Sequence, residues 1–188
     1  AYKVIQAGAK VLGNNKDGID FSLEDDYYGD TRFHIPFIAW YQVMNASLAL
    51  TTMEVLKDRI PVTLEQLQSG IANTRWQGRM ETILPGVIVD GAHNEDGVRR
   101  FVETAERFQK EYPLTLLFSA VNDKDYQDMI HTICSRIKFR KVVTTEVGGY
   151  REVPSAELAE IFCKEGCKEV GNSDNIEEAF HMAHEAKG

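Results

Sequence analysis

The feature that most restricts the fold is the alternation of strand-like and helix-like segments over the second half of the chain. A nearly uninterrupted apolar run over 114–119 stands between two segments, 95–112 and 125–137, whose apolar residues recur with helical spacing. A strand that is apolar on both faces has to be covered on both, which is typical of parallel strands joined by helices. The pattern continues with further segments of both kinds over 141–145, 155–166, 169–171 and 176–186. The expected fold class is therefore α/β, with a mostly parallel sheet and helices on both faces.

The first part of the chain has a weaker pattern. Residues 1–34 are irregular, and this is too little sequence to close a sheet of its own, so we expect the edge of a larger structure. Short β-like pieces fall at 2–5, 19–23 and 31–35, and turns are expected at 13–15 and 25–30.

Two helices should follow, and two short strands after them. Pro36 suits the first turn of a helix expected over 37–58. Thr63 and Gln66 have the spacing of a capping box, which predicts a second helix from there to about residue 72. The two strands are expected over 81–83 and 86–89.

Charge and hydropathy exclude two kinds of partner. The chain carries 21 Lys and Arg against 29 Asp and Glu, a formal net charge of −8, with no clustered basic patch. Binding to nucleic acid through phosphate neutralisation needs such a patch, so no nucleic-acid partner is expected. The longest apolar stretch, over 35–50, is interrupted by polar residues and is too polar to span a bilayer, so no membrane partner is expected.

Cysteine and histidine spacing predicts neither a disulfide framework nor a metal site. The three cysteines favour a reducing, cytoplasmic setting, because an odd number without framework spacing is atypical of secreted proteins. Cys163 and Cys167 are expected to be buried or half-buried thiols. His181 and His184 lie three apart, but no carboxylate or cysteine completes a ligand set, so we expect a solvated helix and no metal.

The loop after the strand at 86–89 is the first candidate site, because ligands of open α/β sheets collect at the carboxyl ends of strands. The Asp90 carboxylate can contact a ribose hydroxyl, a metal-bound phosphate or an amine. The His93 imidazole can donate a hydrogen bond to a phosphate or ribose oxygen. Asn94 can cap the next helix. The next two residues are acidic, which disfavours a bare phosphate at that helix N-terminus. In the alternative interpretation, Asp90 and Asn94 only shape the turn.

Two cations stand near other predicted strands. Lys124 follows the strand at 114–119 and can hold a substrate carboxylate, or else it forms a surface ion pair of little energetic weight. Arg79 precedes the strand at 81–83 and can stack on a base or bind phosphate through its planar guanidinium. The alternative for Arg79 is a linker arginine paired with Glu81.

Three of these segments, in their order and spacing, point to a known family. They read Trp-Gln-Gly-Arg-Met-Glu over 76–81, Val-Ile-Val-Asp-Gly-Ala-His-Asn over 87–94 and Asn-Asp-Lys-Asp over 122–125. Together they resemble folylpolyglutamate synthase and its dihydrofolate synthase relatives, within the Mur ligase superfamily. The segment 41–49 is similar to the family's Gly-x-His-Gln-x-x-Asn helix, with Asn45 retained. Ala39 replaces the Gly and Tyr41 replaces the His, which leaves the role of position 41 open.

The resemblance, which runs from about Phe33 to the end of the chain, implies a domain organisation. Members of the family have an N-terminal ATPase domain, a smaller appended segment and a C-terminal Rossmann-like domain. By this resemblance residues 75–188 are the Rossmann-like domain. Residues 1–74 are a small α+β remnant of the central ATPase domain, with short strands and two helices.

The resemblance also implies a reaction and a set of site residues. ATP phosphorylates a carboxylate of the pteroate or folate, and the amine of L-glutamate attacks the acyl phosphate. Asn45, Arg79, Asp90 and His93 would contact the nucleotide in the cleft between domains, and Lys124 would lie near the incoming glutamate. The implied partners are ATP, L-glutamate, folate or dihydropteroate, and the N-terminal ATPase domain, which would hold most of the Mg²⁺ ligands.

By the same resemblance the chain alone is expected to be inactive. The sequence contains no Gly-x-x-x-x-Gly-Lys-Ser/Thr loop, and the family's phosphate loop, Mg²⁺ ligands and modified lysine belong to the N-terminal domain. No catalytic residue is therefore assigned here. Residues 1–74 should expose apolar surface that the other domain would cover, which favours self-association. Whether the parent enzyme adds the first glutamate, extends polyglutamate tails or does both stays open.

Two other functions compete with a ligase. The chain can be a stand-alone nucleotide- or small-molecule-binding module without catalysis, and an upstream phosphate loop in the same reading frame would favour the ligase instead. A hydrolase that uses Asp90 and His93 is disfavoured, because no Ser or Cys nucleophile stands in an elbow motif.

Overall fold

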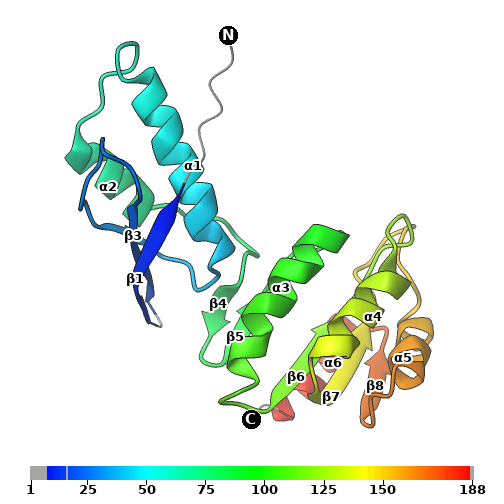
Figure 1. Cartoon of the computed structure of the whole chain (residues 1–188). Helices are drawn as coiled ribbons and strands as arrows, with labels where there is room; N and C mark the ends of the chain where they lie inside the picture. Colours follow the sequence, from blue (N-terminus) through cyan, green and yellow to red (C-terminus); the bar gives the residue numbers. More distant parts are fainter. Residues whose placement is uncertain (1–7, 16, 187–188) are drawn as a thin grey trace. The chain divides into compact units, whose positions relative to one another are not determined.

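The structure is a computed structural model of the chain, and it describes residues 8–15 and 17–186 (Figure 1). The chain divides into two compact units, Ala1–Asp90 and Gly91–Gly188, which are described separately below. This division falls after Asp90. The domain boundary placed between residues 74 and 75 concerns a longer protein and stays a prediction.

The first unit contains a three-stranded antiparallel sheet in the order β1-β2-β3. Its strands are β1 (Ala9–Asn15), β2 (Gly18–Leu23) and β3 (Phe33–Ile35). The expectation that residues 1–34 hold too little sequence for a sheet was therefore wrong. The segment 13–15, expected as a turn, is the end of β1, where Asn15 pairs with Gly18. The β-like piece expected at 2–5 lies outside the described residues.

A glycine at the start of β2 allows this strand to lie close to β3. Gly18 has a φ of +146°, and a Cβ at this position would lie 2.2 Å from the carbonyl oxygen of Ile35. Any other residue would clash there with β3, so Gly18 allows the close approach of the two strands.

Two helices follow the sheet, α1 (Tyr41–Leu56) and α2 (Leu64–Ala72). α1 begins four residues later than the Phe37 start expected from Pro36, because Phe37 and Ala39 are buried before the helix starts. At the start of α2 the predicted capping box is confirmed. The Gln66 N–H donates to Thr63 Oγ1 at 3.2 Å, and the Thr63 N–H donates to Gln66 Oε1 at 2.8 Å.

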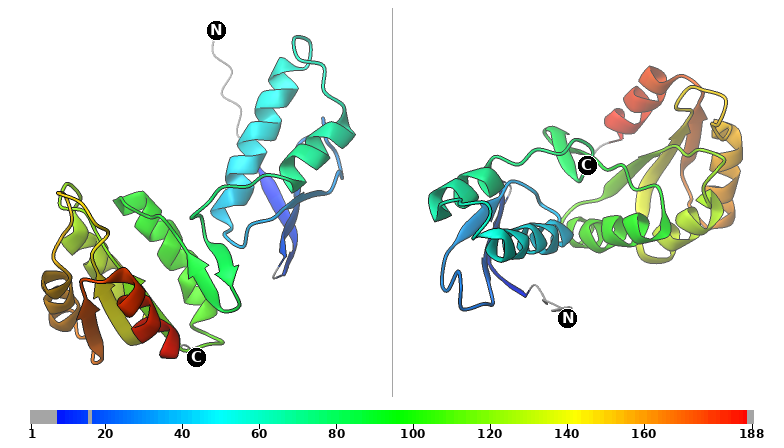
Figure 2. Two further views of the ribbon diagram at one scale, coloured as in Figure 1. Left: turned by 180° about the vertical axis from the view of Figure 1, so that it is seen from behind. Right: turned by 90° about the horizontal axis from the view of Figure 1, so that it is seen from above.

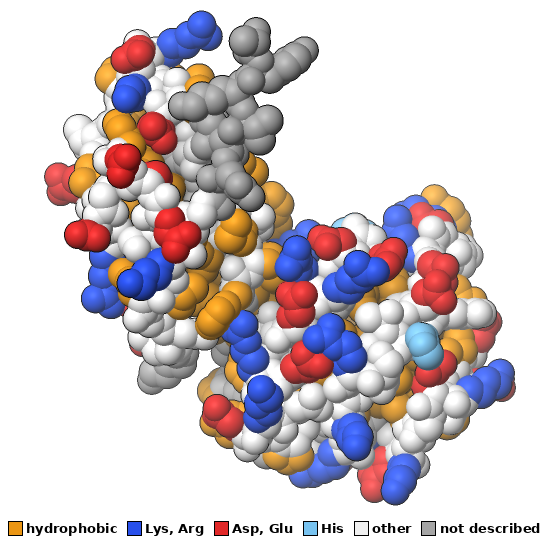
Figure 3. All heavy atoms as spheres, viewed as in Figure 1, with side chains coloured by type: hydrophobic (Ala, Val, Ile, Leu, Met, Phe, Trp, Pro, Cys, Tyr) orange, Lys and Arg blue, Asp and Glu red, His pale blue; other side chains and the backbone are white. Residues whose placement is uncertain are grey.

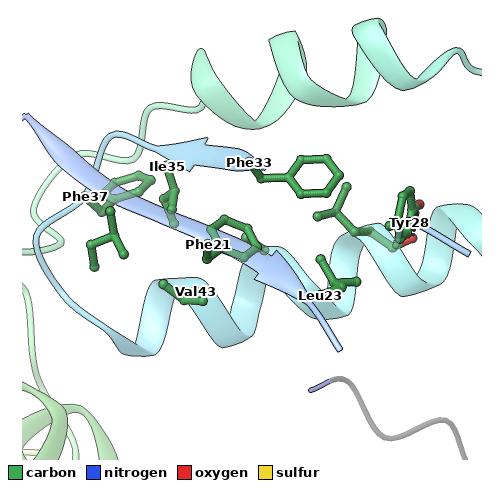
Figure 4. Close-up of a cluster of buried hydrophobic side chains, with 10 residues drawn as sticks. Phe21, Leu23, Tyr28, Phe33, Ile35, Phe37 and Val43 are labelled. Atoms are coloured by element: carbon green, nitrogen blue, oxygen red, sulfur yellow. Dashed lines mark hydrogen bonds between the residues drawn. The ribbon is translucent and has the colours of Figure 1, made fainter. Parts of the chain in front are cut away.

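The core of the first unit lies between the sheet and α1. Ile19, Phe21 and Leu23 alternate along β2 and are all buried, which is the two-residue period of a strand with one covered face. From α1, Val43, Ala46 and Leu50 recur at helical spacing. Figure 4 shows the remaining aromatic and branched side chains that fill this cluster, Tyr28, Phe33, Ile35 and Phe37.

The outer side of α1 is also apolar. Met44, Leu48 and Val55 are 50%, 61% and 60% exposed. Because they are four and seven residues apart, they form one stripe along the helix. The expected apolar surface on this part of the chain is therefore present, and hydrophobic side chains reach the surface among charged ones (Figure 3).

The first unit ends with an antiparallel hairpin that forms a sheet of its own. Its strands are β4 (Glu81–Leu84) and β5 (Val87–Val89), in agreement with the two short strands expected from the sequence. Glu81 pairs with Val89 and Thr82 with Ile88.

The second unit is an α/β unit around a three-stranded parallel sheet in the order β6-β7-β8 (Figure 2). In chain order its elements are α3 (Glu95–Phe108), β6 (Leu114–Phe118), α4 (Tyr126–Arg136), β7 (Phe139–Thr145), α5 (Ser155–Lys164), β8 (Val170–Ser173) and α6 (Ile176–Glu185).

Side chains of β6 alternate between the two covered faces of this sheet. Leu116 and Phe118 pack with buried residues of α3, α4 and α5. On the opposite face, Thr115 Oγ1 donates to the carbonyl oxygen of Ala186 at 2.8 Å, and Leu117 lies beside Phe180 of α6. The predicted fold class is confirmed, since helices cover both faces of a parallel sheet. None of the helices among residues 8–15 and 17–186 is both long and apolar enough to cross a membrane.

Candidate functional site

The β4–β5 hairpin brings Asp90 to the segment that precedes β4. Because Glu81 pairs with Val89, the residues just outside the hairpin, Met80 and Asp90, face each other. The Met80 N–H donates to Asp90 Oδ2 at 2.9 Å. The Asp90 carboxylate therefore does more than shape its own turn, because it also fixes the backbone of the preceding segment.

Met80 has an unusual backbone conformation at this point. Its φ is +48°, in the left-handed region that residues other than glycine rarely occupy, and its side chain is only 3% exposed. Burial of the side chain and the N–H bond to Asp90 hold it there. Such conformations concentrate at functional sites, where the surrounding structure offsets their cost.

Arg79 lies between two left-handed residues, Gly78 and Met80. The Gly78 N–H donates to Glu81 Oε2 at 2.8 Å, which closes the turn and leaves Arg79 half-buried. Among the described residues no ion pair joins Arg79 to Glu81, so the alternative of a linker arginine paired with that carboxylate is not observed.

Tyr41, at the start of α1, lies close to the same place. Burial raises the pKa of its phenol, the nearby Asp90 carboxylate raises it further, and the charge of Arg79 opposes both. In the first unit, the turn at 78–80 and the end of β5 are therefore joined by a hydrogen bond, and the start of α1 lies within electrostatic range of both. The motif leaves the role of Tyr41 open, and no feature of the sequence indicates the conformation of Met80.

Asn45 is on the same side of α1 as Tyr41, because residues four apart lie one helical turn from each other. Its Nδ2 donates to Gln42 Oε1 at 2.8 Å. Gln42 is 8% exposed, so the exposed Asn45 amide is held in place by a buried partner.

The other two candidate residues belong to the second unit. His93 is exposed, and its Nδ1 lies 2.8 Å from the carbonyl oxygen of Gly91. Beside it, Asn94 caps α3 as predicted, with Oδ1 accepting from the Gly97 N–H at 2.8 Å. The acidic first turn of α3 follows, and Glu95 pairs with Arg99.

Lys124 lies in the loop after β6, at the carboxyl end of the parallel sheet. It is exposed, and within residues 8–15 and 17–186 it forms no ion pair, so the alternative of a surface ion pair is not observed. The same part of the chain contains no group of three His, Cys, Asp or Glu residues that could hold a metal ion.

Chemically, the candidate residues of the first unit, Asn45, Arg79 and Asp90, supply three kinds of polar side chain. A guanidinium can bind phosphate oxygens, a carboxylate can accept from a hydroxyl, and an amide can do both.

Comparison with known proteins defines the class. The family described as "Mur ligase, glutamate ligase domain" matches residues 78–188, more than half of the chain. The chain belongs to this family.

The relatives that resemble the chain include folylpolyglutamate and dihydrofolate synthases, and also UDP-N-acetylmuramoyl-L-alanyl-D-glutamate–2,6-diaminopimelate ligases. A dihydrofolate synthase/folylpolyglutamate synthase of Bacillus subtilis is 37% identical over 126 residues, which cover 63% of this chain and 29% of that protein. The resemblance stated from the sequence motifs is thereby confirmed.

Solved structures show the same fold. The folylpolyglutamate synthase of Mycobacterium tuberculosis, complexed with ADP and AMPPCP, matches 95% of this chain with a TM-score of 0.79 and 22% identity, and 41% of its own chain is covered. The folylpolyglutamate synthase of Thermotoga maritima matches 93% of this chain with a TM-score of 0.74 and 24% identity, again over 41% of its length. The chain thus spans less than half the length of these relatives.

Proposed function

We propose that this chain is the C-terminal portion of an ATP-dependent ligase that joins L-glutamate to folate or dihydropteroate. The observation that carries the proposal is the hydrogen bond from the N–H of Met80, the neighbour of Arg79, to Asp90, which holds the turn at 78–80 against the end of β5. In the proposed enzyme Arg79, Asp90 and Asn45 form part of one wall of the ATP cleft. His93 is assigned to the same nucleotide, and Lys124 to the incoming glutamate, from their motifs.

The residues of the first unit fit a nucleotide. Arg79 is half-buried, and its charge is not neutralised by an ion pair with Glu81, so its guanidinium is available for a phosphate. Asp90 stands at the end of a strand, where a carboxylate can accept from a ribose hydroxyl. The Asn45 amide is exposed one helical turn from Tyr41.

The chain's own residues bind and orient, and the bound nucleotide supplies the phosphoryl group that activates the substrate carboxylate. Transfer of that group depends on charge neutralisation by a phosphate loop and Mg²⁺, which the proposal assigns to the N-terminal ATPase domain. We therefore expect no glutamate-dependent ADP release by the purified chain with ATP, L-glutamate and a folate. Robust ADP release under these conditions would refute this part of the proposal.

A cytoplasmic location of the protein also stays a prediction.

The nucleotide site can be tested by titrating the chain with ADP and following amide chemical shifts. We expect shifts around Asn45, Arg79 and Asp90, with weak binding, because part of a cleft offers few contacts. Arg79→Ala should weaken binding by about ten-fold or more, which is the range for a lost hydrogen bond to a charged group. Arg75→Ala is the matched control, because Arg75 is an exposed arginine of the same connection whose guanidinium donates to the Thr74 carbonyl oxygen. Equal affinities for both variants would contradict the assignment.

A further inference from the structure

Two cysteines of the second unit face each other although they are 33 residues apart. Cys134 is in the last part of α4, Cys167 follows α5, and their Sγ atoms are 3.7 Å apart. Both are half-buried beside the cluster that contains Phe162 and Leu158. The third cysteine, Cys163, is exposed, so the expectation of a buried or half-buried thiol holds for Cys167 and was wrong for Cys163.

The end of α5 explains why Cys167 turns back toward α4. Gly166 has a φ of +92°. The Cys167 N–H donates to the Phe162 carbonyl oxygen at 3.1 Å, and the Gly166 N–H donates to that of Cys163 at 3.0 Å. These two bonds and the left-handed glycine form a Schellman motif, in which the residue after the glycine packs against the last turn of the helix. Cys167 is that residue, so the helix termination itself directs its sulfur inward.

A second contact holds the same two segments together. His131 Nδ1 lies 3.0 Å from Glu165 Oε2; His131 is three residues before Cys134, and Glu165 is two residues before Cys167. This contact of neighbouring residues helps to hold the two sulfur atoms 3.7 Å apart, against about 2.05 Å in a disulfide bond.

We propose that Cys134 and Cys167 form a modification site, at which a low-molecular-weight disulfide such as oxidised glutathione oxidises the pair to an intramolecular disulfide. The site is independent of the proposed ligase function, because none of its residues belongs to the nucleotide group. The bond joins α4 to the connection between α5 and β8.

The reaction balances as two successive thiol–disulfide exchanges. The Cys167 thiolate attacks one sulfur of oxidised glutathione, forms a mixed disulfide and releases one glutathione thiolate. The Cys134 thiolate then attacks the Cys167 sulfur, forms the intramolecular bond and releases the second. Two protein thiols are oxidised, one disulfide is reduced to two glutathiones, and the two thiol protons end on the released glutathiones.

The environment of the two sulfurs favours this order and makes the reaction slow. Burial raises the pKa of the Cys134 thiol well above its usual range, and the neighbouring Cys167 raises it further. Burial also raises the pKa of Cys167, but a hydrogen bond from the Cys134 thiol opposes that effect. Cys167 is therefore the more readily ionised of the two. Because the thiolate is the reacting form, the rate should increase with pH.

The position in the fold determines what the bond would change. α4 follows the carboxyl end of β6, so its last turn, with Cys134, lies near the amino ends of the parallel strands. Cys167 precedes β8 and lies at the same edge. The loop with Lys124 lies at the opposite edge, and Asn45, Arg79 and Asp90 belong to the first unit. Oxidation should therefore stabilise the second unit and leave ADP binding unchanged.

The test uses the full chain with Cys163→Ser, which removes the exposed thiol. After incubation with oxidised glutathione and alkylation, we expect the peptides that contain Cys134 and Cys167 to be joined in the monomer, with no glutathione retained. The oxidised form should melt higher than the reduced form, by roughly 5 °C or more, because the bond closes a long loop. ADP titrations of the two forms should coincide, or be equally silent if the nucleotide proposal fails.

The control is Cys134→Ala together with Cys163→Ser, in which Cys167 can only retain glutathione and no disulfide-dependent shift in melting temperature should remain. Alanine avoids placing a hydroxyl in the apolar cluster, and circular dichroism of the reduced control confirms that it folds. Two outcomes would overturn the proposal: both thiols of Cys163→Ser still alkylated after prolonged oxidation at alkaline pH, or glutathione retained on Cys167 while Cys134 stays free. In the unmutated chain, a disulfide between Cys163 and Cys167 would also count against it.

Discussion

Removing the Tyr28 hydroxyl tests the energetics of the first unit at a single atom. Tyr28 is 6% exposed, and its hydroxyl donates to the Leu50 carbonyl oxygen of α1 at 2.8 Å. Its ring packs edge-on against Phe33, with centroids 5.5 Å apart. Tyr28→Phe keeps the ring and its packing and removes only the hydrogen bond, so it isolates that bond from the apolar contacts.

At neutral pH the substitution should destabilise the first unit by about 1 kcal/mol, the usual net contribution of a neutral hydrogen bond. The effect should change sign at high pH. Burial raises the pKa of Tyr28 to about 12 in the folded chain, against about 10 for a free phenol. Stability that depends on the neutral phenol is complete below pH ~10 and is lost as pH rises through the folded pKa. Wild type should therefore lose about 1.4 kcal/mol per pH unit relative to the variant, and the two stabilities should meet near pH ~11.

Tryptophan fluorescence during urea unfolding is the appropriate assay. The chain has two tryptophans, Trp40 and Trp76, and both belong to the first unit, so the signal reports on that unit. Tyr27→Phe is the matched control, because Tyr27 is the neighbouring tyrosine and is 47% exposed. Its stability should stay within about 0.5 kcal/mol of wild type. A difference between wild type and Tyr28→Phe that stays constant from pH 7 to pH ~11 would refute the linkage argument.

Four further substitutions test other parts of the structure. Gly166→Ala should cost about 1–2 kcal/mol in urea unfolding followed by circular dichroism, because φ is +92° and no atom lies within 4 Å of a new Cβ, so the cost is conformational. Gly70 lies inside α2 and also has no atom within 4 Å of a new Cβ, so Gly70→Ala should raise the free energy of unfolding by up to ~1 kcal/mol. An equal loss of stability in Gly166→Ala and Gly70→Ala would contradict this reasoning. Leu48→Lys should reduce the self-association that we expect of the wild-type chain, as measured by light scattering at high concentration. A wild-type chain that stays monomeric would contradict the expectation that the exposed apolar stripe of α1 drives self-association. The hydrogen bond from Arg32 lowers the pKa of Asp20, so stability linked to Asp20 is present above pH ~4 and is lost as pH falls further; acid unfolding of Asp20→Asn should lack that component.

Regular local patterns predicted most elements of the fold. The alternation after residue 86, the capping box at Thr63 and the cap at Asn94 all correspond to structure. β1 was missed because its side chains are mostly exposed and carry no clear apolar alternation; pairing with β2 makes it a strand. The start of α1 was placed too early because Pro36 is compatible with a first turn, whereas the chain bends at residues 36 and 38 and the helix begins only at Tyr41.

The amino-acid sequence by itself determined the fold class, the order of the elements and the resemblance to folate–glutamate ligases, because periodicity, caps and motifs are local properties of the chain. Only the tertiary structure decided which distant side chains meet. The charges of Arg79 and Asp90 act on the Tyr41 phenol although these residues are far apart in the sequence, and Cys134 faces Cys167 because a left-handed glycine ends α5. Such contacts depend on how elements pack, and packing joins residues whose separation along the chain carries no periodic signal.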